Sequence, residues 1–264
     1  KLLIKKNIWL VGASNMAVDY FKVLRSFDAL ITVIGRGEAS SKKFYSKTEF
    51  KPIVGGFKNF LKSKPKKCDS LIIAVSIDNL ANIALQAIDF GIKNILLEKP
   101  GALELDEILS IKNKAQNHNV NVHIAYNRRF YASTLRAKEI IKNDGGVKSF
   151  NFEFTEWSNI VEKSNQNQII KEKWFIANSS HVADLAFFLG GFPTSISSYT
   201  SGVLKWHKSA SIFAGSGKTD TGALFSYQAN WECPGRWSLE VLTNNNRLIF
   251  KPMEKLFIQK KGER

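Results

Sequence analysis

The first half of the chain alternates short apolar runs with segments of helical periodicity, and this alternation constrains the fold more than any other feature. The apolar runs cover residues 7–11, 30–35, 70–76, 94–98 and 120–126. Apolar side chains recur at helical spacing between them, which predicts helices over 16–26, over the stretch that ends before Gly91 and over 104–116. Strands this apolar, separated by helices, indicate a parallel sheet covered on both faces.

After about residue 145 the chain changes to runs in which apolar and polar side chains alternate, with turns between them. These runs lie at 147–157, 195–201, 209–215, 222–231, 236–243 and 247–250. The pattern predicts an antiparallel sheet with one covered face, interrupted by a helix near 181–189. The stretch 158–173 is polar enough to predict a mobile loop whose position would suit a lid.

The chain carries a formal net charge of +15, but its lysines do not form a pattern typical of nucleic-acid binding. They are dispersed, and the densest run, "KSKPKK" at 62–67, has no interleaved aromatic residues. We therefore expect no nucleic-acid partner; a steep salt dependence of oligonucleotide affinity would identify one. A positive field favours encounters with anionic small molecules instead.

Cysteine and histidine spacing predicts neither a disulfide nor a metal site. Cys68 and Cys233 lie far apart, and His118, His123 and His207 show no ligand spacing with them. A reducing cytoplasm fits this composition. No apolar run approaches the roughly 18 residues of a membrane span. The N-terminal segment lacks a small-residue cleavage site, so we expect no signal peptide.

The turn after the first apolar run reads "VGASNMA", a variant of the G-x-G-x-x-G/A pattern of dinucleotide sites. Gly12 allows a tight turn, Ser14 leaves the backbone accessible to a pyrophosphate, and Ala17 permits close helix packing. The helix start, at Asn15 and Met16, adds N–H donors and the positive end of the helix dipole. An ordinary strand-to-helix turn is the alternative, and the surrounding strand–helix–strand pattern favours the dinucleotide site.

The second apolar run ends in "GRGEASSKK", where NAD-specific sites usually carry an acid for the ribose hydroxyls. An arginine can bond a phosphate through two parallel N–H groups, whereas an acid here would repel it. Arg36, Ser40, Ser41 and Lys42 could therefore hold the 2′-phosphate of NADP. A basic surface turn is the alternative.

A lysine ends the apolar run in "ILLEKPGAL", residues 95–103, between an acid and a proline. Burying an unpaired ammonium costs several kcal/mol, so Lys99 is either turned to solvent or held by partners in a cleft. Ligands of parallel sheets bind beyond the carboxyl ends of the strands, which is where this pattern places Lys99.

A histidine begins the predicted helix of "NSSHVADLAFFLGG", residues 178–191. His181, Asp184 and Phe188 lie near one another at helical spacing. The remaining apolar side chains provide a packing stripe: Val182, Leu185, Ala186 and Leu189. A single histidine at a helix start is more often structural, so the spacing alone assigns it no chemistry.

Taken in order, "VGASNMA", "IIAVSIDNLANIALQAIDFGIKNILLEKPGAL", "AYNRRFY" and "NSSHVADLAFFLGG" resemble the Gfo/Idh/MocA family of nicotinamide-dependent oxidoreductases. The resemblance covers nearly the whole chain, and its most specific part is E-K-P at 98–100 followed by Y-N-R-R-F at 126–130. It implies an α/β fold, with an N-terminal Rossmann-type doubly wound parallel sheet that binds the dinucleotide (1–122). An α+β domain with a mostly antiparallel, open-faced sheet for substrate binding and oligomerisation would follow (123–264).

The resemblance also implies roles for individual residues. It makes Lys99 the group that reaches the nicotinamide ribose and the reacting hydroxyl, and His181 the proton acceptor. The implied cofactor contacts are Gly12, Ser14, Asn15, Met16, Ala17, Arg36, Ser76, Asn79, Glu98 and Lys99. The implied substrate contacts are Tyr126, Asn127, Arg128, Asn178 and Asp184.

One position departs from the family pattern, in which an acid precedes the histidine by four residues. Ala177 stands there, so we expect the pKa of His181 to depend on groups from elsewhere, with Asp184 and the substrate as candidates. The implied activity is hydride transfer between NADP(H), or alternatively NAD(H), and a sugar, polyol or nucleotide sugar. A cofactor-binding sensor or scaffold that has lost turnover is the alternative.

The strands of the second half contain more aromatic side chains than one layer of helices need cover. They include Phe150, Phe152, Phe154, Phe225 and Tyr227. We therefore predict that the uncovered face of this sheet forms an interface between identical subunits.

Overall fold

The structure, a computed structural model, describes residues 5–263, and the chain divides into two units. The first unit runs to Ala125 and the second begins at Tyr126, just beyond the boundary expected at 122/123. Residues 1–4, on which the expectation of no signal peptide partly rests, lie outside the described residues, as does residue 264. Within the described range, no helix is long and apolar enough to cross a membrane.

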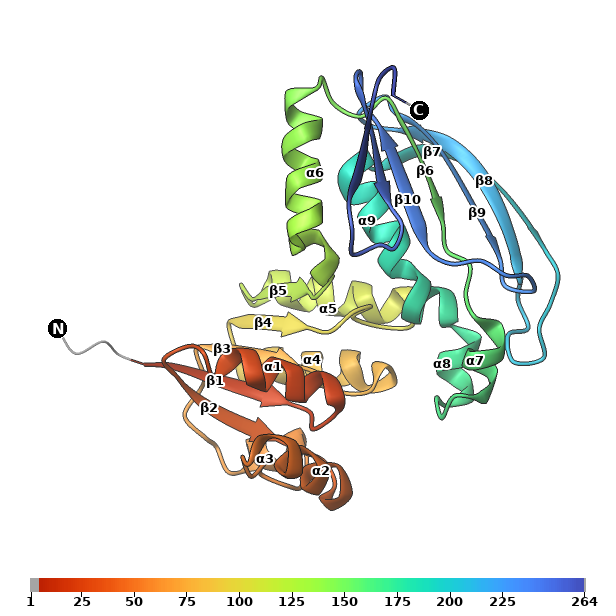
Figure 1. Cartoon of the computed structure of the whole chain (residues 1–264). Coiled ribbons are helices and arrows are strands. Elements are labelled where there is room, and N and C mark those ends of the chain that lie inside the picture. Colours follow the sequence, from red (N-terminus) through yellow and green to blue (C-terminus); the bar gives the residue numbers. More distant parts are fainter. Residues whose placement is uncertain (1–4, 264) are drawn as a thin grey trace. The chain divides into compact units, whose positions relative to one another are not determined.

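Five parallel strands in the order β2-β1-β3-β4-β5 form the sheet of the first unit (Figure 1). This confirms the parallel sheet that the apolar runs predict. Its elements are β1 (Lys6–Val11), α1 (Asn15–Leu24), β2 (Ala29–Ile34), α2 (Glu38–Thr48), α3 (Phe57–Lys62), β3 (Ser70–Ile73), the 3-10 turn η1 (Ile77–Asn79), α4 (Leu80–Phe90), β4 (Asn94–Leu97), α5 (Leu105–Asn117) and β5 (Asn121–Ile124).

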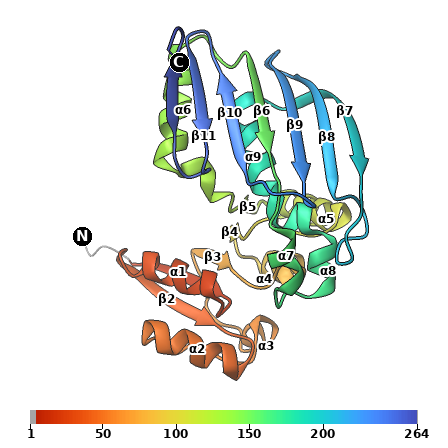
Figure 2. The ribbon, with the colours of Figure 1, turned by 45° about the vertical axis from the view of Figure 1, so that its right-hand side comes forward.

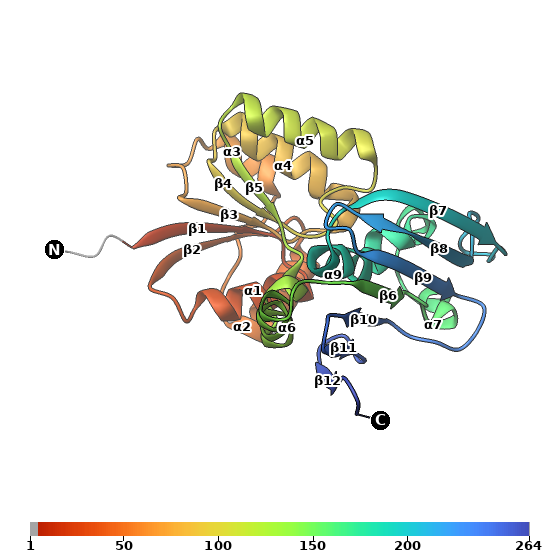
Figure 3. The same ribbon diagram turned by 90° about the horizontal axis from the view of Figure 1, so that it is seen from above.

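Helices cover both faces of this sheet, with α1 and α2 on one side and α3, α4 and α5 on the other (Figure 3). Successive side chains of β1 point to opposite faces. Leu10 packs in one core with Phe21 of α1, whereas Trp9 packs in the other core with Ile88 of α4. Burial of each aliphatic or phenylalanine side chain contributes about 1.5–3 kcal/mol, so both faces stabilise the sheet.

Seven strands in the order β12-β11-β10-β6-β9-β8-β7 form the sheet of the second unit (Figure 2). All neighbours are antiparallel except β6 and β9, which are parallel. The elements are the 3-10 turn η2 (Asn127–Phe130), α6 (Ala132–Asn143), β6 (Ser149–Glu153), α7 (Ser158–Lys163), α8 (Gln168–Glu172), the π-helical turn η3 (Phe175–Ser179), α9 (Ser180–Gly190), β7 (Pro193–Ser201), β8 (Ile212–Thr219), β9 (Leu224–Asn230), β10 (Ser238–Leu242), β11 (Asn246–Phe250) and β12 (Phe257–Lys260).

The aromatic side chains that predicted a subunit interface point toward the covered face of this sheet. Phe150, Phe152 and Phe225 are at most 4% exposed and contact the ring of Phe187 on α9. The opposite face carries small polar side chains, among them Ser149, Asn151, Ser216 and Ser226. The aromatic argument for an oligomer was therefore wrong, because one helical layer does cover these rings. The oligomer itself stays a prediction.

Residues 158–173 form two short helices, α7 and α8, in place of the predicted loop. Each helix buries one apolar side chain, Val161 in α7 and Ile170 in α8. The Oδ1 atom of Asn167 accepts a hydrogen bond from the backbone N–H of Ile170 at 2.9 Å and caps α8. The loop prediction was wrong because single apolar residues among polar ones produce no periodic signal.

Two glycines of β8 leave room for aromatic rings of the neighbouring strand β9. A Cβ atom at Gly215 would lie 2.4 Å from the ring of Tyr227. A Cβ atom at Gly217 would lie 2.7 Å from the ring of Phe225 and 2.0 Å from the backbone oxygen of Ser195. Gly215 and Gly217, in the run "GSGK" of β8, therefore allow this strand to pack closely against the aromatic rings of β9.

We predict that Gly217→Ala lowers the free energy of unfolding of the second unit by about 2–3 kcal/mol, because the backbone oxygen cannot move aside as a flexible side chain would. The measurement is urea unfolding followed by tryptophan fluorescence. Ser216→Ala, on the opposite face of the same strand, should change stability by less than about 0.5 kcal/mol. Equal unfolding midpoints for the two variants would contradict this packing argument.

Candidate functional site

The glycine turn of the first unit lies at the carboxyl ends of neighbouring strands and lines a pocket of about 230 Å³. The residues around this pocket follow β1, β2 and β3. The polar and glycine positions among them are Gly12, Ser14, Arg36, Ser40, Gly56, Ser76 and Asn79. Five of the predicted cofactor contacts thus meet in one pocket.

Backbone geometry requires glycine at position 12. Its φ is +127°, and a Cβ atom would lie 2.1 Å from the backbone oxygen of Ala74, at the end of β3. The hydroxyl of Ser14 donates to that same oxygen at 3.2 Å and accepts from the N–H of Ala17 at 3.4 Å. Ser14 therefore caps α1 and ties its first turn to β3.

The first turn of α1 provides the features of an anion site. Helix geometry leaves the N–H groups of Asn15 and Met16 without intrahelical acceptors, and the positive end of the helix dipole lies there. The Oδ1 atom of Asn15 accepts from the Nζ of Lys47 at 2.8 Å, which adds a positive charge nearby. Met16 is exposed and Ala17 is buried against the core. This arrangement suits a phosphate group.

Arg36 follows β2 at the edge of this pocket, with an exposed side chain. Among the described residues it forms no ion pair, and Ser40 lies beside it in the pocket wall. Ser41 is buried against Gly35 and Lys42 is exposed, and neither is among the residues that line the pocket. The basic segment thus offers Arg36 and Ser40 to a ligand.

Lys99 occupies the corner of a tight turn at the carboxyl end of β4. The N–H of Gly101 donates to the oxygen of Glu98 at 3.0 Å, and the Lys99–Pro100 peptide is cis. Gly101 has a φ of +89°, and a Cβ atom there would lie 2.7 Å from Ile124. Pro100 is buried and Lys99 is half-buried. The hydrogen bond and the crowding at Gly101 therefore fix the backbone of this turn, while the role of the Lys99 ammonium stays a prediction.

Glu98, which precedes Lys99, has a partner on α1. The hydroxyl of Tyr20 donates to its carboxylate at 2.6 Å. Burial raises the pKa of Glu98, against the opposing effects of this hydrogen bond and of the charge on Lys99. Glu98 thus ties β4 to α1, which is a structural role beside the cofactor contact that the sequence predicts.

His181 lies in the first turn of α9, directly after the π-helical turn η3, and is half-buried. Its ring packs edge-on against Tyr126, with ring centroids 6.0 Å apart, and lies 6.1 Å from the ring of Trp237. The predicted substrate residue Tyr126 is thus brought to His181 within the second unit. Trp237 was not predicted, because the sequence "PGRW" carries no motif.

Other predicted substrate residues have partners of their own. Asp184 forms a bidentate ion pair with Arg129, so its carboxylate holds η2 against α9. Arg128 pairs with Glu254 at 2.9 Å, and Asn127 is exposed. Asp184 is therefore committed to a salt bridge, which leaves it poorly suited to tune His181.

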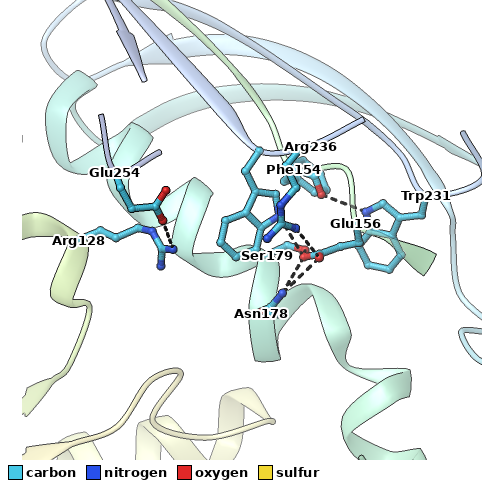
Figure 4. A network of polar contacts seen from close by, with 9 residues as sticks. Arg128, Phe154, Glu156, Asn178, Ser179, Trp231, Arg236 and Glu254 are labelled. Atoms are coloured by element: carbon cyan, nitrogen blue, oxygen red, sulfur yellow. Dashed lines mark hydrogen bonds and ion pairs between the residues drawn. The ribbon is translucent and has the colours of Figure 1, made fainter. Parts of the chain in front are cut away.

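Glu156, whose buried carboxylate lies just after β6, is a second residue that sequence reasoning missed (Figure 4). It accepts hydrogen bonds from the Ser179 hydroxyl at 2.7 Å, from the Asn178 amide at 3.0 Å and from the Trp237 indole at 3.2 Å. Arg236 lies 3.4 Å from its other oxygen. Burial raises the pKa of Glu156, and these donors oppose the shift.

Glu156 thus brings a carboxylate to the segment in which Ala177 replaces the expected acid. Its partners Asn178 and Ser179 follow Ala177 directly and precede His181. No motif marks Glu156 in the sequence, because it stands 22 residues before Asn178. Within residues 5–263 no group of three or more His, Cys, Asp or Glu side chains could hold a metal ion.

A known family matches the chain in sequence over its first unit, and solved structures match its fold over both units. Residues 6–126 match the family model GFO_IDH_MocA, described as an oxidoreductase family with an NAD-binding Rossmann fold. The first unit belongs to the Gfo/Idh/MocA oxidoreductase family. The resemblance predicted from the sequence is confirmed, and Gly12 and Lys99 lie within the matched range. A search of curated proteins found no match.

Solved structures resemble the chain over both units. The WlbA dehydrogenase from Bordetella pertussis, in complex with NADH and UDP-GlcNAcA, is 15% identical, with a TM-score of 0.80 over 98% of this chain and 84% of that one. An oxidoreductase from Agrobacterium radiobacter, with NAD+, L-tartaric acid and magnesium, is 13% identical, with a TM-score of 0.81 over 98% and 78%. Levoglucosan dehydrogenase, with NADH and L-sorbose, is 18% identical, with a TM-score of 0.78 over 99% and 78%. At these identities the likeness shows the fold.

We predict that Glu156→Gln removes a pH dependence from the stability of the second unit. Because burial raises the pKa of Glu156, the folded state favours its protonated form. That contribution is fully present below the unfolded value of 4.5 and is lost as the pH rises through the folded pKa.

Urea unfolding between pH 4 and about 8 measures this effect. Relative to Glu156→Gln, the unmodified protein should lose stability as the pH rises above 4.5. Glu139→Gln, an exposed glutamate on α6 paired with Arg136, is the control and should keep the original profile. Parallel profiles for Glu156→Gln and the unmodified protein would contradict the assignment.

Proposed function

We propose that the protein transfers hydride between a nicotinamide cofactor and a sugar, polyol or nucleotide sugar. The observation that carries this proposal is the pocket of the first unit, where Gly12, the start of α1 and Arg36 meet at the carboxyl ends of adjacent strands. The family of this unit is one of NAD-binding oxidoreductases. Ligands in the related structures, UDP-GlcNAcA and L-sorbose, support the substrate class.

The residues of the pocket fit the cofactor. The N–H groups of Asn15 and Met16 would hold the pyrophosphate, with Ser14 shaping the turn and Ala17 packing behind it. Arg36 and Ser40 would hold a 2′-phosphate, which favours NADP over NAD. Ser76 and Asn79, joined by a 3.0 Å hydrogen bond, would line the ribose side. The nicotinamide, when bound, supplies or accepts the hydride.

Two side chains would carry the remaining chemistry. Lys99, fixed by its turn, would stabilise negative charge on the reacting oxygen through its ammonium. His181, flanked by Tyr126, would take or return the proton, because imidazole titrates near neutral pH. Asn127, Arg128 and Asn178 remain proposed substrate contacts. A homo-oligomer and a cytoplasmic location remain predictions from the sequence.

We predict that Lys99→Met lowers turnover by about 100- to 1,000-fold, because an electrostatic donor to the reacting oxygen is lost. His181→Asn should lower it by about 100-fold and flatten the pH dependence near neutrality. The measurement is absorbance of the reduced cofactor over a panel of sugars, polyols and nucleotide sugars. Lys93→Met, at the start of β4, and exposed His123→Asn are matched controls.

Near-normal rates for both Lys99→Met and His181→Asn would overturn these roles. Cofactor binding without hydride transfer on any member of the panel would favour the sensor or scaffold alternative, which the alanine at position 177 motivates.

We predict that the protein prefers NADP(H) and that Arg36→Asp weakens its affinity by tenfold or more, with a much smaller effect on NAD(H). The acid would repel the 2′-phosphate and could bond ribose hydroxyls instead. Cofactor fluorescence titration measures both affinities. Lys42→Asp, on the exposed side of α2, makes the same charge change outside the pocket and should change both affinities little. Equal affinities of the unmodified protein for the two cofactors would reject the preference.

A further inference from the structure

The guanidinium of Arg236 is held between two tryptophan rings in the second unit. Its Cζ atom lies 4.4 Å from the ring centroid of Trp237 and 4.6 Å from that of Trp157. Trp237 is buried, whereas Trp157 is 52% exposed. The Arg236 side chain itself keeps 42% of its surface exposed. The guanidinium therefore contacts one buried ring and one ring at the surface.

A guanidinium that packs on aromatic rings donates hydrogen bonds from its edges, where its N–H groups lie. Such a planar group presents paired N–H donors that match a carboxylate or a phosphate. Since the tryptophans restrict the plane of Arg236, little side-chain entropy remains to be lost on binding. This is the arrangement of a preorganised anion donor.

Among the described residues, Glu156 is the acid partner of Arg236, and it takes only one of the guanidinium N–H groups. Only Nη1 approaches Glu156, at 3.4 Å, while the shorter hydrogen bonds to that carboxylate come from Ser179, Asn178 and Trp237. A residue needed only to neutralise Glu156 would be expected to make a closer contact and to be buried with it. The Arg236 side chain is instead 42% exposed, whereas that of Glu156 is 2% exposed.

A second arginine lies against the same indole. The Cζ atom of Arg128 is 5.2 Å from the Trp237 ring centroid, and its buried Nε has no hydrogen-bond partner within residues 5–263. The Trp237 ring also lies 6.1 Å from that of His181. One indole therefore contacts two guanidinium groups and the proposed proton carrier.

We propose that Arg236, held between Trp157 and Trp237, binds an anionic group of the substrate, either a carboxylate or a phosphate. This inference rests on the proposed function and narrows its substrate class to an acidic sugar, either a uronate or a phosphate-bearing sugar. The anionic group would bind Arg236 and the reacting group would meet His181, both of which lie beside the ring of Trp237.

Binding to the full chain tests the proposal with matched probes that differ by one anionic group. The pairs are glucose against glucuronate, glucose against glucose 6-phosphate, and UDP-glucose against UDP-glucuronate, each followed by calorimetry. In at least one pair the probe with the added anionic group should bind tenfold or more tightly than its parent. Arg236→Gln should weaken that probe by about 10- to 100-fold and leave its parent unchanged, as expected for a lost hydrogen-bonded charge. Whether uronate or phosphate responds identifies the anion.

Two further variants test whether Arg236 recognises the anion through its planar N–H donors or only through its positive charge. Arg236→Lys keeps the charge but loses the planar fork, so it should restore only part of the affinity. Trp157→Ala, at an exposed position, should weaken the charged probe several-fold while the protein stays folded by circular dichroism. Arg247→Gln removes the same charge from a pair with Glu240 on β10 and should change no affinity.

The proposal is overturned if no charged probe is preferred, or if Arg247→Gln weakens charged probes as much as Arg236→Gln does. Should Arg236→Gln fail to fold, Arg236→Lys and Trp157→Ala decide the question. Hydride transfer to a neutral sugar that survives in Arg236→Gln, without any anion preference, would leave the proposed function standing and remove this subsite alone. A clear anion preference without hydride transfer would support this subsite and contradict the proposed function.

Discussion

One buried carboxylate organises the part of the second unit that carries His181. Removing an ionised carboxylate from water costs several kcal/mol unless hydrogen bonds replace the lost water. For Glu156 the Ser179 hydroxyl, the Asn178 amide and the Trp237 indole provide these bonds. The network therefore joins the end of β6, the start of α9 and the segment before β10, because releasing any of them would leave the buried acid with fewer donors.

Trp237 connects this structural network to the side chains that are proposed to act on the substrate. Its N–H donates to Glu156, while its ring contacts the rings or guanidinium groups of His181, Arg128 and Arg236. A ring fixed through its edge gives these three side chains a common, rigid surface. The orientation of the proposed proton carrier and of the proposed anion donor therefore depends on one hydrogen bond to a buried acid.

In the first unit the corresponding constraint lies in the backbone. β1 and β3 are neighbours, and the oxygen of Ala74 fills the space that a side chain at Gly12 would need. The sheet order then places Arg36, Gly12, Ser76 and Lys99 after four adjacent strands. Because the proposed phosphate site would be made of N–H groups, Ser14 can replace the second glycine of the pattern.

Periodicity and motif order in the sequence determined the parallel sheet, the helix that carries His181 and the family of the first unit, because each leaves a local signal in apolar spacing or glycine placement. Helices α2, α3 and α6 and the helices in 158–173 were missed, since each buries a single apolar side chain, such as Phe44 or Val161. The sequence also shows that alanine, at position 177, stands where the family pattern has an acid, four residues before His181. Only the tertiary structure decided that Glu156 approaches the residues beside it, that Asp184 pairs with Arg129 and that Arg236 lies between two tryptophans. These contacts depend on strand pairing, as between β6 and β10, and on helix packing, as between η2 and α9, neither of which local periodicity encodes.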